Sequence, residues 1–270
     1  MRGANRPDCA DCTFTPKEKV CMHPKGKAQK GCPTLGKKRL RESARNEYKK
    51  ADVKEFARQA SIQESECYSG REQRPYVMHP VKPRIQEICE FAGKMGYERL
   101  GLVFCVGLAK EAEAVSRILK TQGFDLVSVA CKVGCVPKEE IGLKDDEKIF
   151  IGGYEAMCNP ILQAKVVNDA GSQFNVLLGL CVGHDSLFFK YAEAPTTVLA
   201  VKDRVTGHNP LAAVYVSGNY YSWLKEPQRR KAANLSEAQS ASADETNLNE
   251  RKSNDPNRLK GQSRNKQNRK

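Results

Sequence analysis

The sequence predicts an α/β protein, in which a Rossmann-like, mostly parallel sheet with helices on both faces follows a small four-cysteine metal knuckle. Three observations support this fold class. Short apolar runs alternate with amphipathic segments in the second half of the chain, several of these runs end in a cysteine, and a cysteine-dense stretch with few apolar residues opens the chain. Continuous apolar strands that alternate with helices are typical of a parallel sheet buried on both faces.

Residues 1–36 are expected to form the metal knuckle. They carry the C-x2-C pair Cys9 and Cys12, followed by Cys21 and Cys32. A segment this short and polar cannot bury a core of its own, and four thiolates around a zinc ion would supply the missing folding energy. We therefore predict a structural zinc site at these four cysteines. An iron or iron–sulfur site, unmetallated thiols, and His23 in place of one thiolate are the alternatives that the spacing leaves open.

Residues 37–98 are expected to be a helical linker and packing helices. Apolar residues recur at helical spacing between Lys37 and Cys67, and again around Cys89. Cys67 falls at the end of the first helical stretch, before Gly70, and Cys89 falls on the apolar face of the next helix. We interpret Cys67 and Cys89 as small buried hydrophobic side chains rather than as ligands.

Residues 99–224 are expected to form the α/β body. Strands are predicted at 100–105, at 124–131, in the run FNVLLGLC that ends at Cys181, and at 196–201. A helix is predicted at 108–122, ended by Gly123. Asn159 is a good N-cap residue and Pro160 suits the first helical position, so Cys158 should stand directly before a helix N-terminus.

The carboxyl ends of parallel strands share one edge of a sheet, where α/β proteins bind their ligands. We therefore expect Cys105, Cys131 and Cys181 to meet at this edge, with Cys158 joining them from its helix start. Four converging thiolates repel one another unless a cation lies among them, so the first hypothesis is a second metal or iron–sulfur centre, with Cys135 as a spare ligand. The plainer alternative is that buried strands simply accommodate cysteine.

The second hypothesis is a cysteine-dependent, hydrolase-like enzyme. The run GLCVG matches the strand–turn–helix elbow that carries a nucleophile, with Cys181 in that position. Asp203 and His208 follow in the acid–histidine order of α/β-hydrolases, and His184 is a second candidate base. The body is short for that fold, and the elbow leaves the other strand-end cysteines unexplained. Whether the protein is an enzyme therefore stays open.

The formal net charge of +13 comes from the two ends of the chain, because residues 1–50 carry 14 Lys and Arg against 5 Asp and Glu, and residues 225–270 carry 12 against 6. No nucleic-acid reading motif accompanies these ends, so nucleic acid is not an expected partner. Residues 225–270 are expected to be a disordered basic tail. No apolar run approaches the roughly 20 residues of a membrane span, and the opening MRGANRPDC has no apolar leader core, so we expect a cytoplasmic protein that does not contact a membrane.

The segments CNPILQA, NVLLGLCVGHDSLFFKYAEAPTTVLAVKDRVTGHNPLAAVY, GLVFCVGLAKEA and CADC resemble an uncharacterised prokaryotic family of predicted metal-binding proteins that is common in anaerobes. The resemblance covers most of residues 8–221, and the basic tail looks like an addition. It implies metal binding by the four amino-terminal cysteines, and the chain is similar to the family also at the other candidate ligands, Cys105, Cys131, Cys158 and Cys181. Cys67 and Cys135 fall where the family usually has other residues. The resemblance implies no reaction and no substrate. From the two cysteine sets we expect a redox or metal-handling role, with a metal ion and a redox protein as partners.

Overall fold

The computed structural model describes residues 6–227, so most of the predicted basic tail lies outside the described residues. The chain divides into two compact units, the first ending at Pro210 and the second beginning at Leu211. The described part of the second unit contains a short helix and a 3-10 turn, α8 (Leu211–Tyr215) and η4 (Ser222–Lys225). No helix within residues 6–227 is both long enough and apolar enough to cross a membrane.

Helices dominate the segment between the amino-terminal cysteines and the sheet. Its elements are α1 (Pro33–Gly36), α2 (Lys38–Glu47), α3 (Ala51–Glu66), the antiparallel pair β1 (Tyr68–Ser69) and β2 (His79–Pro80), and α4 (Arg84–Lys94). The long helical stretch predicted between Lys37 and Cys67 is thus divided between α2 and α3. Phe56 of α3 packs edge-on against Phe91 of α4, with ring centroids 5.0 Å apart. Cys67 and Cys89 are buried, 9% and 7% exposed.

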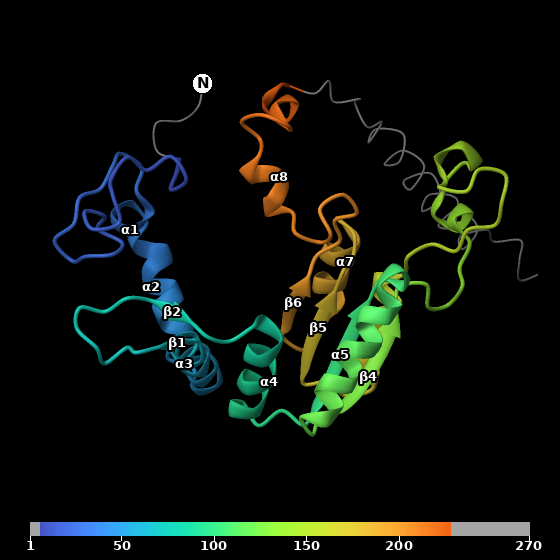
Figure 1. Cartoon of the computed structure of the whole chain (residues 1–270), viewed down its shortest axis with the longest axis horizontal. Coiled ribbons are helices and arrows are strands. Elements are labelled where there is room, and N and C mark those ends of the chain that lie inside the picture. Colours follow the sequence, from blue (N-terminus) through green and yellow to red (C-terminus); the bar gives the residue numbers. More distant parts are fainter. Residues whose placement is uncertain (1–5, 228–270) are drawn as a thin grey trace, which may run out of the picture. The chain divides into compact units, whose positions relative to one another are not determined.

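A four-stranded parallel sheet forms the body, as the alternation of apolar runs and helices predicted (Figure 1). Its strand order is β4-β3-β5-β6. The strands are β3 (Arg99–Phe104), β4 (Asp125–Ala130), β5 (Phe174–Leu178) and β6 (Thr196–Ala200). The connecting helices are η1 (Val106–Leu108) with α5 (Ala109–Thr121), then α6 (Pro160–Asp169), and α7 (His184–Tyr191).

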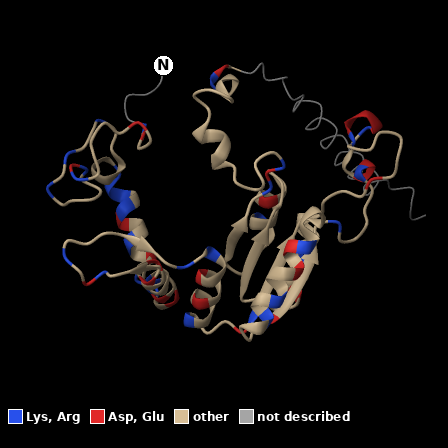
Figure 2. Cartoon of the chain, viewed as in Figure 1, with Lys and Arg blue, Asp and Glu red and all other residues tan. Residues whose placement is uncertain are grey.

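Helices cover both faces of the sheet. Successive side chains of each strand point to alternate faces, so each strand contributes apolar residues to both cores. On one face, Leu100 and Leu102 of β3 join Val176 of β5 in a core with α4 and α5. On the other face, Val103 and Leu177 pack with residues of α6 and α7 such as Val167 and Phe188. The strands are mostly uncharged, whereas Lys and Arg gather along α2 (Figure 2). This arrangement confirms the α/β class and agrees with the Rossmann-like prediction.

A lobe of residues 132–157 leaves the sheet after β4 and returns at the start of α6. It contains two 3-10 turns, η2 (Lys138–Ile141) and η3 (Asp145–Glu147). Its base is closed by hydrogen bonds from Met157 N to Val136 O (2.8 Å) and from Lys138 N to Glu155 O (3.1 Å). The lobe is therefore an insertion between β4 and α6, and its two ends meet at the carboxyl edge of the sheet.

Candidate functional site

The carboxyl edge of the sheet brings two of the predicted cysteines side by side. Cys105 directly follows β3 and Cys131 directly follows β4, and their N–H groups continue the strand pairing. Cys105 N donates to Leu178 O at 3.1 Å, and Cys131 N donates to Phe104 O at 2.8 Å. Adjacent parallel strands in register therefore end in adjacent thiols.

Cys158 joins this pair from the start of α6. Asn159 caps the helix as predicted, its side chain accepting from Leu162 N at 3.0 Å, and its own N–H donates to Cys131 O at 2.7 Å. Gln163, which is fully buried, donates from Nε2 to Val129 O (2.8 Å) and Phe104 O (3.2 Å). These bonds fix the start of α6 against the ends of β3 and β4, and with it Cys158.

The sulfurs of Cys131 and Cys158 lie 3.8 Å apart, and Val106 N donates to the Cys131 sulfur at 3.4 Å. Cys105 and Cys131 are 8% and 2% exposed, and Cys158 is half-buried. All three pack in the layer that α6 and α7 cover. We call Cys105, Cys131 and Cys158 the thiol cluster.

The thiols of the cluster differ in acidity because they share hydrogen bonds. Interaction with Cys131 lowers the pKa of Cys105 to about 5, against the effect of burial, and the Gly107 N–H and the Lys202 ammonium act in the same direction. Interactions with Cys131 and then with His184 lower the pKa of Cys158 to about 4. The two neighbours raise the pKa of Cys131 far above its usual range. Of the three thiols, Cys131 therefore favours the protonated form, whereas Cys105 and Cys158 favour the thiolate form.

Cationic side chains surround the cluster, and the sequence reasoning did not assign them. The charge of Lys202 acts on Cys105 and that of Lys132 acts on Cys158. The Arg204 guanidinium Nη2 lies 3.1 Å from the sulfur of Cys181 and also senses the charges of Cys105 and Cys158. The available signal was positional, because Lys202 and Arg204 follow β6 and Lys132 follows β4, at the same edge of the sheet as the cysteines.

Cys181 lies at the rim of this group, three residues beyond the end of β5. Gly179 and Gly183 on either side of it have φ angles of 69° and 87°. Cys181 itself does not have a positive φ, so the glycines make the turn. Its carbonyl accepts from the N–H groups of His184 (3.0 Å) and Asp185 (3.1 Å) at the start of α7. The described contact of its sulfur is with Arg204.

His184 faces Cys158 rather than the cysteine nearest to it in sequence. The interaction with Cys158 raises the pKa of His184, against the effect of burial. Its Nδ1 atom is buried and has no hydrogen-bond partner among the described residues. The structure therefore pairs an imidazole with a thiol that the sequence had not linked to it.

Asp203 and His208 form a turn with each other. Asp203 N donates to His208 Nδ1 at 3.1 Å, and His208 N donates to Asp203 O at 2.9 Å. The Asp203 carboxylate accepts from Val205 N and Thr206 N, at 2.9 and 3.0 Å. The catalytic roles of these two residues stay predictions.

Cys135 lies in the lobe and is exposed, with its sulfur 3.2 Å from the Tyr154 hydroxyl. The four amino-terminal cysteines, in contrast, line a single cavity of about 90 Å³ (Cys9, Cys12, Cys21 and Cys32). Within residues 6–227 no group of three or more His, Cys, Asp or Glu side chains is already arranged as a metal site. The ligand roles of both cysteine sets therefore stay predictions.

The fold and the cluster define the chain as a cysteine-rich α/β protein with thiols at the strand ends. The chain belongs to the family described as "Protein of unknown function (DUF1847)", which matches residues 32–199. It is also similar to "Uncharacterized protein MJ0455" of Methanocaldococcus jannaschii, with 41% identity over 169 residues, which cover 63% of this chain and 83% of the relative. No solved structure is detectably similar.

The comparisons support the resemblance to an uncharacterised family. The matched residues include the thiol cluster, His184 and Cys181. They begin at Cys32, so Cys9, Cys12 and Cys21 lie outside them, as do Arg204 and His208.

Proposed function

We propose that the strand-end cysteines form a thiolate centre for a soft metal ion or an iron–sulfur cluster, and that the protein has a redox or metal-handling role. The observation that carries this proposal is the distance of 3.8 Å between the sulfurs of Cys131 and Cys158. Tetrahedral zinc, with Zn–S bonds of about 2.3 Å, keeps neighbouring thiolates about 3.8 Å apart. A disulfide would need about 2.05 Å.

The donor set and its surroundings fit such a group. Cys105 is the third ligand of the proposed centre and Cys181 the fourth. Soft thiolates select zinc, copper or iron–sulfur clusters over magnesium and calcium. The positive charges of Lys132, Lys202 and Arg204 offset the negative charge that four thiolates would carry. A bound metal would supply Lewis acidity, and a cluster would supply one-electron transfer.

We propose a second, structural zinc site at the amino-terminal cysteines. Its support is the cavity that all four of them line, together with the scarcity of apolar side chains in this segment. Lys19 and Lys27 line the same cavity and would offset the charge of a four-thiolate zinc centre. The two proposals are independent, because no residue is shared between the two ligand sets.

Metal content after anaerobic purification tests both proposals. The wild-type chain is expected to carry zinc at the amino-terminal site and a second zinc or an iron–sulfur cluster at the strand ends. Cys131→Ser should lose only the second centre and Cys12→Ser only the first, while the buried Cys89→Ser control should keep both. One zinc per chain, without iron or sulfide and lost only in Cys12→Ser, would overturn the strand-end centre.

A cysteine-dependent enzyme remains the second candidate, and one observation favours it: His184 lies beside Cys158, with a buried Nδ1 that has no described partner. A thiol paired with an imidazole is the arrangement of cysteine nucleophiles. The structure therefore offers Cys158 as a nucleophile besides the predicted Cys181. Alkylation of metal-free protein, mapped by mass spectrometry, separates the two. Dominant labelling of Cys158 that slows in His184→Gln supports the pair, and labelling unaffected by that change contradicts it.

A further inference from the structure

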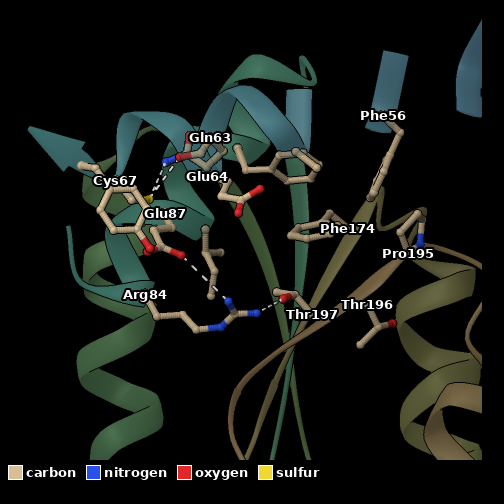
Figure 3. A pocket seen from close by; sticks show the side chains of 14 residues that line it. Phe56, Gln63, Glu64, Cys67, Arg84, Glu87, Phe174, Pro195, Thr196 and Thr197 are labelled. Atoms are coloured by element: carbon tan, nitrogen blue, oxygen red, sulfur yellow. Dashed lines mark hydrogen bonds and ion pairs between the residues drawn. The ribbon is translucent and has the colours of Figure 1, made fainter. Parts of the chain in front are cut away.

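A cavity of about 570 Å³, drawn in Figure 3, lies at the amino ends of β5 and β6, whereas the thiol cluster lies at the carboxyl ends of the strands. Its sheet residues, Phe174 and Thr196, begin β5 and β6, whereas Cys105 and Cys131 follow the ends of their strands. The helices α3 and α4 supply most of the rest of the lining, and Cys67, Tyr68, Pro195 and Thr197 complete it. Its volume is within the range of small-molecule sites.

Aromatic rings form the apolar part of this cavity. Phe91 packs against Phe56 and Phe174, with ring centroids 5.0 and 5.6 Å apart. Phe91 and Phe174 are 9% and 4% exposed, so these two rings are held by the core. The two rings therefore present a fixed apolar surface to a ligand bound in the cavity.

The one arginine of the lining is already engaged. Arg84 donates from Nε to Val198 O (2.9 Å) and from Nη2 to the Thr197 hydroxyl (2.8 Å), and its Nη1 lies 3.9 Å from a Glu87 carboxylate oxygen. Its charge is therefore directed at β6 and Glu87 rather than at the open space.

The Glu64 carboxylate, in contrast, has no hydrogen-bond or ion-pair partner among the described residues, and Figure 3 shows it beside the aromatic rings. Lysines on neighbouring elements are committed elsewhere, since Lys82 pairs with Glu90 (2.6 Å) and Lys94 with Glu66 (2.8 Å). With two carboxylates and one engaged arginine, the lining carries a net negative charge.

We propose that this cavity binds a small organic cation with an apolar body. The ammonium group pairs with Glu64 and the apolar body lies against Phe56, Phe91 and Phe174. An anionic ligand is disfavoured because Glu64 and Glu87 would repel it. A cation gains from both the carboxylate and the faces of aromatic rings. This site is separate from the proposed thiolate centre and does not depend on it.

The probe is 3-phenylpropylammonium, compared by calorimetry with its neutral and anionic analogues, 3-phenylpropan-1-ol and 3-phenylpropionate. For about ten non-hydrogen atoms we expect a Kd on the order of 1 mM. The ammonium should bind at least about threefold more tightly than the alcohol, as expected for an ion pair with the exposed Glu64 beside aromatic rings, and the carboxylate should not bind. Glu64→Gln should remove this preference, while Glu55→Gln, an exposed position on the same helix that is absent from the lining, should keep it.

Amide shifts in wild-type protein locate the probe without any substitution. They should concentrate on α3, the start of α4 and the first residues of β6, and Cys131→Ser should leave both the shifts and the Kd unchanged. Equal binding of the alcohol, full affinity in Glu64→Gln, shifts centred elsewhere, or no saturation by about 10 mM would each overturn the proposal.

Discussion

Among the glycines of residues 6–227, Gly179 is the one at which an added Cβ would approach another atom most closely. Its φ is +69°, and a Cβ built on it would lie 1.9 Å from Leu108 Cδ1, a side chain that is 3% exposed. We expect Gly179→Ala to lower the free energy of unfolding by about 2–4 kcal/mol, from backbone strain and overpacking together. Gly123→Ala is the control, because its φ is +93° but nothing lies within 4 Å of the added carbon. That control should cost about 1–2 kcal/mol. If urea unfolding showed the same loss of unfolding free energy in Gly179→Ala and Gly123→Ala, the contact with Leu108 would not be the cause.

Glu90 should make stability depend on acid pH. Burial opposes its ionisation, but hydrogen bonds from Lys82, Gln63 and Gln86 outweigh burial and lower its pKa from 4.5 to about 2. The stabilisation is therefore complete above about pH 4.5, the pKa in the unfolded chain, and is lost as the pH falls towards 2.

Protonation of Glu90 at acid pH is expected to lower the free energy of unfolding by about 1–3 kcal/mol. Unfolding free energies measured at pH 5 and pH 2.5 should differ less in Glu90→Gln than in wild type. The exposed Glu113→Gln, whose partner is Arg117, should behave like wild type. An unchanged difference in Glu90→Gln would rule out Glu90 as the source.

At this scale the sequence predicted the approach of Cys105, Cys131 and Cys158, but not the polar neighbours of these thiols, and the place of Cys181 in a shared centre stays a prediction. The positions of Cys105 and Cys131 follow from the period of parallel strands, which sequence patterns reveal. The pairing of His184 with Cys158 depends on how α7 packs beside the start of α6. That packing is a tertiary property, and the nearness of His184 to Cys181 in sequence suggested the other partner.

Among the elements, the lobe of residues 132–157 is held together by ion pairs of its buried Lys148 and Glu155 side chains, and Glu155 lies near the base of the lobe. Glu155 accepts from the N–H groups of Ile149 (2.9 Å) and Phe150 (3.2 Å) and pairs with Lys138 at 2.6 Å. Lys148, with a side chain 5% exposed, pairs with Glu139 and Asp145. These contacts hold Ile149 and Phe150 outward, 71% and 66% exposed.

Glu155→Ala should therefore loosen the lobe without unfolding the sheet. Hydrogen exchange at Ile149 and Phe150 should accelerate about tenfold or more, while the amides of β3 and β5 keep their protection. Glu147→Ala, which removes only the exposed acceptor of Lys144 N, is the matched control. Uniform acceleration through the sheet would show that the lobe is not an independent local unit.

The strands were the elements that the sequence predicted best, because continuous apolar runs bounded by glycine leave few alternatives. The division between α2 and α3 was not predicted, since helical spacing continues across Tyr48. Residues 132–157 showed no periodic pattern, and their organisation depends on ion pairs between residues that sequence patterns do not connect.

For the molecule as a whole, a metal ion that binds only the folded chain should raise the free energy of unfolding with the logarithm of its concentration relative to its Kd. A ligand at a hundred times its Kd adds about 2.7 kcal/mol to the folded state. Removing metal by a chelator should lower the Tm of wild-type protein, and restoring it should recover the Tm. Cys131→Ser should show a smaller recovery than Cys89→Ser. Identical recoveries in the two variants would place the stabilising metal away from the strand ends.

The family match concerns the same region of the chain that the sheet occupies. Residues 32–199 contain all four strands except the last residue of β6. Fold class and membership of an uncharacterised family were therefore accessible from sequence. The identity of the proposed metal was not, because the spacing of cysteines across separate strands does not distinguish a zinc site from an iron–sulfur site.

The closed base of the lobe has a consequence for how the chain can vary. Because Asn159 N reaches Cys131 O at 2.7 Å, the two attachment points stay together whatever lies between them. Lengthening such a connection costs only about 0.6 kcal/mol for each doubling of its length. The segment 138–155 is accordingly the place where insertions, deletions or a grafted peptide can be accommodated while the strand-end thiols keep their spacing.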